Sequence, residues 1–239
     1  MTVILSRKSE AGPRSSSSGA RIVPDVHVCP FESEAFVSEE NPRILVLGIG
    51  NILMLDEGVG NRIATELQSN YRFPDDVSVM DAGTMGLGMM HLFRGVEFLL
   101  VVDAVDGTGH PAGTVVRVAP EDFAPNQVLH SLHDIRFVDV LNAARMIDIM
   151  PEADCIGIQV ENMSPAELTI GLSGPVESAL PRAIAAVLYV LEERGVVAEP
   201  IAGGDAALHS AVAAAKADVA RRQDELRDTA TEGSGQSDA

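Results

Sequence analysis

Three carboxylate side chains follow apolar runs that are expected to be buried strands: Asp81 and Asp103 stand where strands end, and Glu57 follows the first strand through a loop. If these strands are parallel, their carboxyl ends meet at one edge of the sheet, which is where ligands bind in such folds. Two carboxylates that lie close together there repel each other unless they share a cation or a proton. An imidazole from His130 or His133, near the start of an expected helix, would complete a plausible metal site.

The first of these carboxylates belongs to the glycine-rich stretch 44–60, ILVLGIGNILMLDEGVG, which has the strand, turn and helix pattern of a dinucleotide-binding fold. The first two glycines fit the GxGxxG fingerprint of that fold, but Leu53 occupies the third glycine position. Asp56 and Glu57 also place negative charge where a pyrophosphate would approach. A nucleotide-dependent enzyme is therefore disfavoured.

Apolar runs alternate with helical periodicity between residues 43 and 197. We expect strands over Arg43–Gly48, Val77–Met80, Phe98–Val102, Thr114–Val118 and Cys155–Val160. We expect helices over Gly60–Asn70, Leu87–Phe93, Leu132–Ile149 and Pro175–Leu191. Strands that are apolar throughout and separated by helices predict a three-layer α/β/α sandwich with a mainly parallel, mixed and twisted sheet of about five strands. The short Gly/Pro loop before Thr114–Val118 indicates that this strand lies antiparallel to the preceding one.

Two segments of different composition flank this α/β region. Residues 1–42 contain SSSSG, scattered charges and several prolines, and we expect a disordered leader there. Residues 198–239 contain an alanine-rich stretch, Ala206–Arg227, which we expect to be a helix followed by a disordered tail. The domain that carries the chemistry is therefore expected over 43–197.

The composition excludes several classes of partner. The 239-residue chain has a net charge of −18, most of it within residues 43–203. Such an acidic fold repels phosphate backbones, so we expect no nucleic-acid partner. No apolar run is long enough for a signal peptide or a membrane span, so we expect no membrane insertion. The two cysteines, Cys29 and Cys155, form no CxxC pair, which fits a reducing, cytoplasmic setting.

From Arg43 to about Val197, the sequence resembles the [NiFe]-hydrogenase maturation proteases. The matching segments are Ile44–Glu57 with its GxGN-x4-DE pattern, Asp81–Thr84 (DAGT), Leu99–Asp106 (LLVVDAVD), Ser131–His133 followed by Asp139–Leu141, Cys155–Val160 (CIGIQV), and Gly171–Val176 (GLSGPV). Any one of these motifs alone is weak. The glycine motif, the VVDA strand and the helix histidine in this order and spacing are jointly specific.

The resemblance implies an α/β endopeptidase that removes the C-terminal extension of a hydrogenase large-subunit precursor after nickel insertion. Its implied metal ligands and catalytic residues are Glu57, Asp103 and His133, so the Asp-Glu pair would serve a cation. Nickel would come with the precursor, and another divalent ion could act as a surrogate.

The resemblance also implies that Asp81, Ala82, Gly83 and Thr84 take part in substrate selection. Ala82 stands where the family commonly has glycine, so the choice of hydrogenase stays open. The alternative is a metal-dependent binding module that holds the precursor without cutting it. The sequence does not indicate an oligomeric state.

Overall fold

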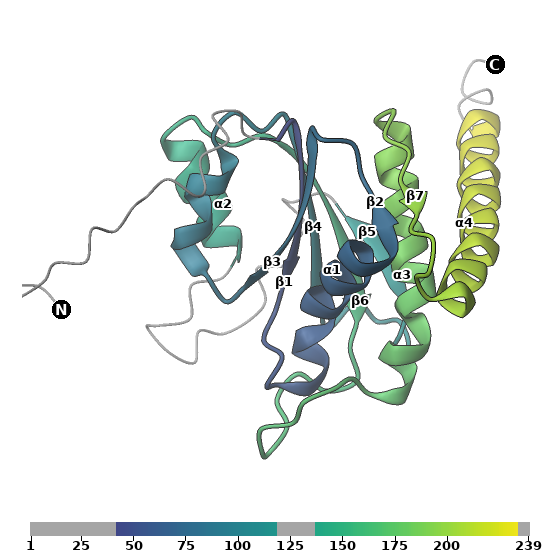
Figure 1. Ribbon diagram of the computed structural model, residues 1–239, viewed down its shortest axis with the longest axis horizontal. Helices are drawn as coiled ribbons and strands as arrows, with labels where there is room; N and C mark the ends of the chain where they lie inside the picture. The colour runs from purple at the N-terminus through teal and green to yellow at the C-terminus, as the bar shows by residue number, and fades with distance from the viewer. Residues whose placement is uncertain (1–41, 119–136, 234–239) are drawn as a thin grey trace, which may run out of the picture. The chain divides into compact units, whose positions relative to one another are not determined.

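A five-stranded sheet with helices on both faces forms the centre of the structure (Figure 1). The computed structural model describes residues 42–118 and 137–233. The strands lie in the order β3-β1-β4-β6-β5; the first four are parallel, and β5 is antiparallel to β6. The predicted three-layer α/β/α fold with a mainly parallel, mixed sheet is thus confirmed. The expected leader, residues 1–42, lies almost entirely outside the described residues.

The strands of the main sheet are β1 (Ile44–Ile49), β3 (Val77–Gly83), β4 (Phe98–Val105), β5 (Val115–Val118) and β6 (Glu152–Gln159). A separate two-stranded ribbon pairs β2 (Tyr71–Arg72) with β7 (Glu199–Pro200). Two expectations need correction. β3 and β4 continue through Asp81 and Asp103, because backbone pairing continues after the side chains become polar. β5 pairs with β6 and not with β4, because β4 already has β1 and β6 on its two sides.

The helical segments are η1 (Leu55–Gly58), α1 (Val59–Asn70), η2 (Gly86–Phe93), α2 (Phe137–Met146), α3 (Gly174–Glu193) and α4 (Ala206–Gly233). α2 ends three residues before the expected Ile149. Asp148 adopts a left-handed φ of 57°, and the amides of Asp148 and Ile149 donate back to the carbonyls of Arg145 and Ala144. This hydrogen-bonded turn terminates the helix. The expected first residues of this helix, 132–136, lie outside the described residues.

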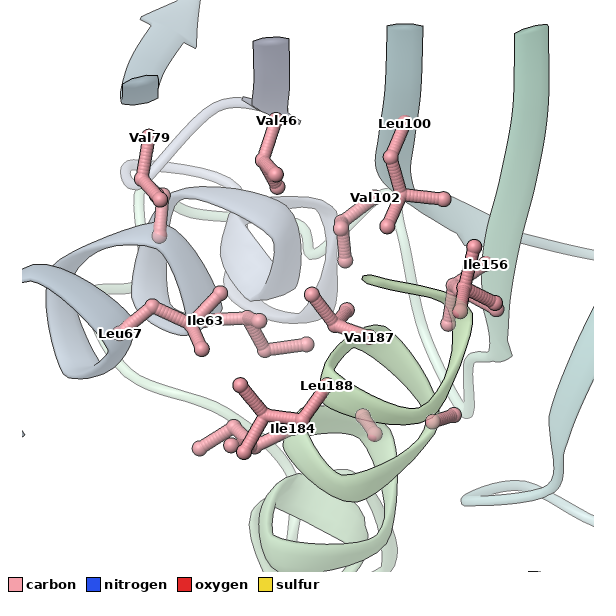
Figure 2. Packing of buried hydrophobic residues seen from close by; sticks show 14 of the residues in the cluster. Val46, Ile63, Leu67, Val79, Leu100, Val102, Ile156, Ile184, Val187 and Leu188 are labelled. Carbon is pink, nitrogen blue, oxygen red and sulfur yellow. The ribbon is translucent and has the colours of Figure 1, made fainter. Parts of the chain in front are cut away.

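Both faces of the sheet are buried, which explains why its central strands are apolar throughout. On one face, strand residues such as Val46 and Leu100 pack against Ile63 of α1 and Val187 of α3 (Figure 2). On the other face, the alternate strand residues pack against η2 and α2. Cys155 is fully buried in this second cluster, as expected for a core residue.

Two long helices, α3 and α4, pack side by side, and α3 covers the first face of the sheet. Within the described residues, α3 is the helix whose length and composition would suit a membrane span, but 56% of its apolar window is buried inside the fold. Its apolar character is explained by packing against the sheet. The alanine-rich helix expected from the sequence is observed as α4, which packs along the outer side of α3 (Figure 1). Val212 of α4 is 2% exposed in this contact.

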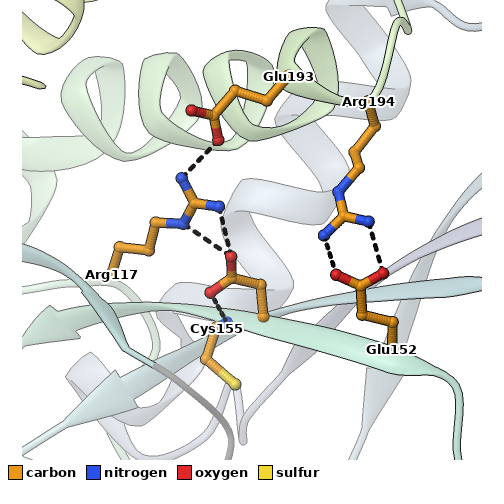
Figure 3. Close-up of polar contacts among 6 residues, drawn as sticks. Arg117, Glu152, Cys155, Glu193 and Arg194 are labelled. Carbon is orange, nitrogen blue, oxygen red and sulfur yellow. Dashed lines mark hydrogen bonds and ion pairs between the residues drawn. The ribbon is translucent and has the colours of Figure 1, made fainter.

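Ion pairs tie the end of α3 to the edge of the sheet (Figure 3). Arg117 of β5 contacts Asp154 and Glu193, each with a 2.6 Å nitrogen–oxygen distance. Arg194 makes a two-pronged pair with Glu152 and also stacks 3.9 Å over the ring of Phe98. Arg117 therefore neutralises two carboxylates that come from different elements.

We expect Arg117→Met to lower the free energy of unfolding by about 1–3 kcal/mol, because it removes the charged hydrogen bonds that Arg117 makes to the partly buried Asp154 and to Glu193. Urea unfolding measures this change. Arg62→Met is the matched control, since Arg62 also pairs with two carboxylates but is more exposed. That control should change stability by less than about 0.5–1 kcal/mol. Equal losses in the two variants would contradict a structural role for the Arg117 pairs.

Candidate active site

Glycines allow Glu57 to approach the central strands. Gly50 has a φ of 149°, and a Cβ there would lie 1.9 Å from the carbonyl oxygen of Glu57. A Cβ on Gly60 would lie 2.1 Å from the oxygen of Ile49 and 2.4 Å from that of Val102. Only glycine fits such close backbone contacts. Helix α1 therefore begins directly against the ends of β1 and β4, and η1, which carries Glu57, lies beside β4.

Asp103 lies on β4 opposite Gly157 of β6. Burial raises the pKa of the Asp103 carboxyl to about 8, and the charge of Glu57 adds to this rise. The amide of Ala104 opposes the rise, because it donates a 2.7 Å hydrogen bond to the carboxylate. The charge of Glu57 acts on Asp103, and η1 contacts β4, so these two predicted site residues lie in the same part of the structure.

The third predicted ligand, His133, and its competitor His130 lie within 119–136, outside the described residues. Among the residues that the structure does describe, no group of three or more His, Cys, Asp or Glu side chains is placed to hold a metal ion. The carboxylate pair nevertheless suits a divalent cation, because a cation relieves both the repulsion and the burial of the charges. The ligand set Glu57, Asp103 and His133 stays a prediction.

Asp56, next to Glu57, has a different environment. It is 0% exposed, and its carboxylate accepts four hydrogen bonds. The donors are the amides of Glu161 (2.9 Å), Asn162 (3.0 Å) and Ser173 (2.7 Å) and the hydroxyl of Ser173 (2.9 Å). The interpretation of Asp56 and Glu57 as a pair serving a cation is therefore wrong for Asp56, whose described contacts anchor the 161–173 loop.

The side chains of Asp56 and Glu57 diverge because they are neighbours in a 3₁₀ turn, where successive residues point about 120° apart. The sequence feature that could have distinguished the role of Asp56 from that of Glu57 is Ser173, which immediately precedes α3. A serine at this position usually caps its own helix. Here no side-chain cap forms, and the hydroxyl bonds to Asp56 instead.

A shallow pocket of about 220 Å³ lies beside this site. Its lining comes from the first loop, α1 and the end of β3: Gly50, Asn51, Ile52, Asn61, Asp81, Gly83 and Thr84. Three of the four predicted selection residues therefore line one pocket. Ala82 does not, because its side chain is 2% exposed and packs in the core on the η2 side. Ala82, which stands where the family commonly has glycine, is therefore not part of the pocket lining.

Asn61 supplies the buried polar group of this pocket, which sequence reasoning missed. Its side chain is only 4% exposed, and its amide nitrogen donates to Asp81 at 2.5 Å. Asp81 also accepts the amide of Gly83 at 2.9 Å. Within the described part of the chain, Asn61 Oδ1 has no hydrogen-bond partner. A buried acceptor of this kind favours a ligand or water that donates a hydrogen bond.

Comparisons with known proteins identify the family of this fold and site. The family model described as hydrogenase maturation protease matches residues 61–190. The hydrogenase expression/formation protein HupM of Azotobacter chroococcum is 41% identical over 170 residues, which cover 68% of this chain and 78% of HupM. The hydrogenase 2 maturation protease of Escherichia coli is 35% identical over 162 residues, 66% of this chain and 96% of that protein.

A solved structure agrees with these sequence matches. The hydrogenase maturating endopeptidase HybD from Escherichia coli superposes with a TM-score of 0.59 at 35% identity, covering 66% of this chain and 97% of HybD. The similarity therefore spans almost the whole of that smaller protein.

Proposed function

Because the chain belongs to the hydrogenase maturation protease family, and is thus a hydrolase of the peptidase class, we propose that it removes the C-terminal extension of a [NiFe]-hydrogenase large-subunit precursor after nickel insertion. The observation that carries this proposal is the position of Asp103 near the carboxyl end of β4, where burial raises its pKa and the charge of Glu57 on the adjoining η1 adds to the rise. Two carboxylates held in this way are stabilised by a cation that arrives with the substrate.

In this proposal, Glu57, Asp103 and His133 hold the nickel of the precursor. Two carboxylate oxygens and one imidazole nitrogen are suitable ligands for Ni²⁺ or a surrogate divalent ion. A nickel-free precursor lacks this contact with the three side chains, so it would bind less well and would not be positioned for cleavage. Nickel thus acts as the recognition element.

The reaction itself is peptide hydrolysis. Water adds to the scissile carbonyl carbon, one carboxylate of the pair accepts a proton from that water, and the C–N bond breaks as the amine leaves with a proton. When bound, the nickel ion supplies Lewis-acid polarisation. In this proposal, the pocket beside Asn61 selects a flanking residue of the precursor through Asp81, Gly83 and Thr84.

We expect the purified protein to shorten a nickel-loaded precursor and to leave the nickel-free precursor intact. Mass spectrometry of a cognate large-subunit precursor, before and after incubation, measures this directly. Cleavage of both forms would contradict the recognition role of nickel. Binding of the loaded precursor without any loss of mass would instead favour a non-catalytic binding module.

A further inference from the structure

Four aliphatic side chains are exposed beside the candidate active site. Ile52 and Leu53 are 55% and 41% exposed, and Leu168 and Ile170 are 73% and 77% exposed. Ile52 and Leu53 lie between β1 and η1, while Leu168 and Ile170 lie in the loop between β6 and α3. A group of exposed aliphatic residues next to a functional site is typical of a binding surface.

Backbone hydrogen bonds join these two loops. The amide of Thr169 donates to the carbonyl of Leu53, and the amide of Leu55 donates to the carbonyl of Thr169, both at 2.8 Å. Met54 and Thr169 form an isolated parallel bridge. We call residues 51–55 and 167–171 together the two-loop platform. Because its halves are hydrogen-bonded, the exposed aliphatic residues of the two loops are held near one another.

The longer loop is also fixed at both of its ends. Asp56 binds the amides of Glu161 and Asn162 at one end and that of Ser173 at the other. In Figure 1 this segment projects from the sheet beside the start of α1. A projecting loop supported by a fully buried carboxylate is prearranged for contact, which lowers the entropy lost on binding.

The platform is continuous with the candidate active site. Ile52 lines the pocket that contains Asp81 and Thr84, and Glu57 follows the platform after one intervening residue. A polypeptide with its scissile bond at Glu57 and Asp103 therefore has to pass close to the platform.

We propose that the two-loop platform docks an uncharged, aliphatic segment of the precursor that lies near the scissile bond. This inference rests on the proposed function. Charge favours this occupant over a second copy of the chain, which has a net charge of −18. Glu161 and Glu167 are exposed in the same loop, so an approaching acidic surface would be repelled.

The test uses full-length protein with the substitutions Leu168→Ser and Ile170→Ser together. We expect the dissociation constant and KM for the nickel-loaded precursor to rise by about 10-fold or more, with kcat changed by less than about twofold, since lost ground-state contacts act mainly on KM. Both side chains are solvent-exposed, so circular dichroism and urea unfolding should match those of the unmodified protein.

Two further variants support the test. Ile52→Ser changes the other loop and should weaken precursor binding in the same direction. Met146→Ser with Ile147→Ser is the matched control, because these side chains are 86% and 54% exposed at the end of α2, away from the carboxyl ends of the strands. The control should bind and cleave as the unmodified protein does.

The outcomes separate this inference from the proposed function. Unchanged precursor affinity in Leu168→Ser/Ile170→Ser overturns the docking role, whether or not cleavage occurs. Self-association of the free protein that this variant abolishes also overturns it, because the occupant would then be a second copy. Tight, platform-dependent binding without cleavage supports the docking surface and contradicts the endopeptidase function.

Discussion

Asp103→Asn is expected to stabilise the metal-free protein at neutral pH and at the same time to abolish precursor cleavage. The stabilisation arises because asparagine removes a carboxyl that burial and the charge of Glu57 disfavour in its ionised form. Asparagine keeps an oxygen that can accept the Ala104 amide. Cleavage is lost because the substitution removes a predicted nickel ligand, and we expect a decrease of at least about 100-fold.

The sign of the pH dependence follows from the raised pKa. Below pH 4, Asp103 is protonated in both the folded and the unfolded protein and contributes nothing. Between pH 4 and about 8 the unfolded chain ionises while the folded protein keeps the proton, so the free energy of unfolding falls as pH rises. Asp103→Asn removes this loss, and at pH 7 we expect a gain of about 2–4 kcal/mol, at about 1.4 kcal/mol per pKa unit.

Urea unfolding in the presence of a chelator, repeated from pH 4 to pH 8, measures the effect. Asp75→Asn is the control, since Asp75 is an exposed carboxylate in the turn before β3 and its change should be within about 0.5 kcal/mol. Added Ni²⁺ should stabilise the unmodified protein more than Asp103→Asn. A variant that is less stable than the unmodified protein at pH 7 would contradict the environment assigned to Asp103.

The sheet was predictable because its central strands are covered on both faces. Leu45 and Val46 are both buried, one against each layer of helices, so the sequence shows a continuous apolar run. The ends of the strands were less predictable. Asp103 is polar, yet it continues the ladder opposite Gly157, and side-chain polarity does not report on backbone pairing. The partner of β5 was also missed, since strand order depends on which edge of the sheet is free.

Two of the three predicted ligands, Glu57 and Asp103, were identified from the positions of carboxylates after apolar strands. Glu57 and Asp103 were expected near each other because the carboxyl ends of parallel strands share one edge, and in the structure the charge of Glu57 acts on Asp103. The same reasoning could not show that Asp56 has a different role from Glu57. Its partners are more than 100 positions away in sequence, so only the folded chain shows that its carboxylate supports the 161–173 loop.

Asp56→Asn is therefore the substitution that should show how much this support contributes. All four donors point at the carboxylate, so an amide nitrogen in either position faces at least one N–H donor. A buried donor without an acceptor typically destabilises a protein by about 1–3 kcal/mol, and hydrogen bonds to charged groups are stronger than neutral ones. We expect the free energy of unfolding to fall by about 2–4 kcal/mol.

Asp205→Asn is the matched control. Asp205 Oδ1 also accepts two backbone hydrogen bonds, from Ala207 and Leu208 at the start of α4, but it is exposed. Asparagine is as good as aspartate at such a position, so stability should change by less than about 0.5 kcal/mol. If the two variants were equally stable, the hydrogen bonds of Asp56 would not anchor the loop.

Stability alone does not connect Asp56 to the site, so a second readout is needed. If Asp56 positions Glu57 and the two-loop platform, Asp56→Asn should speed amide hydrogen exchange in 161–173 at temperatures where the rest of the fold stays protected. It should also weaken Ni²⁺ binding by calorimetry, although Asp56 is not a predicted ligand. Faster exchange with unchanged Ni²⁺ affinity would limit Asp56 to supporting the loop. Both changes together would mean that one buried carboxylate holds the predicted metal ligand and the docking loop in register.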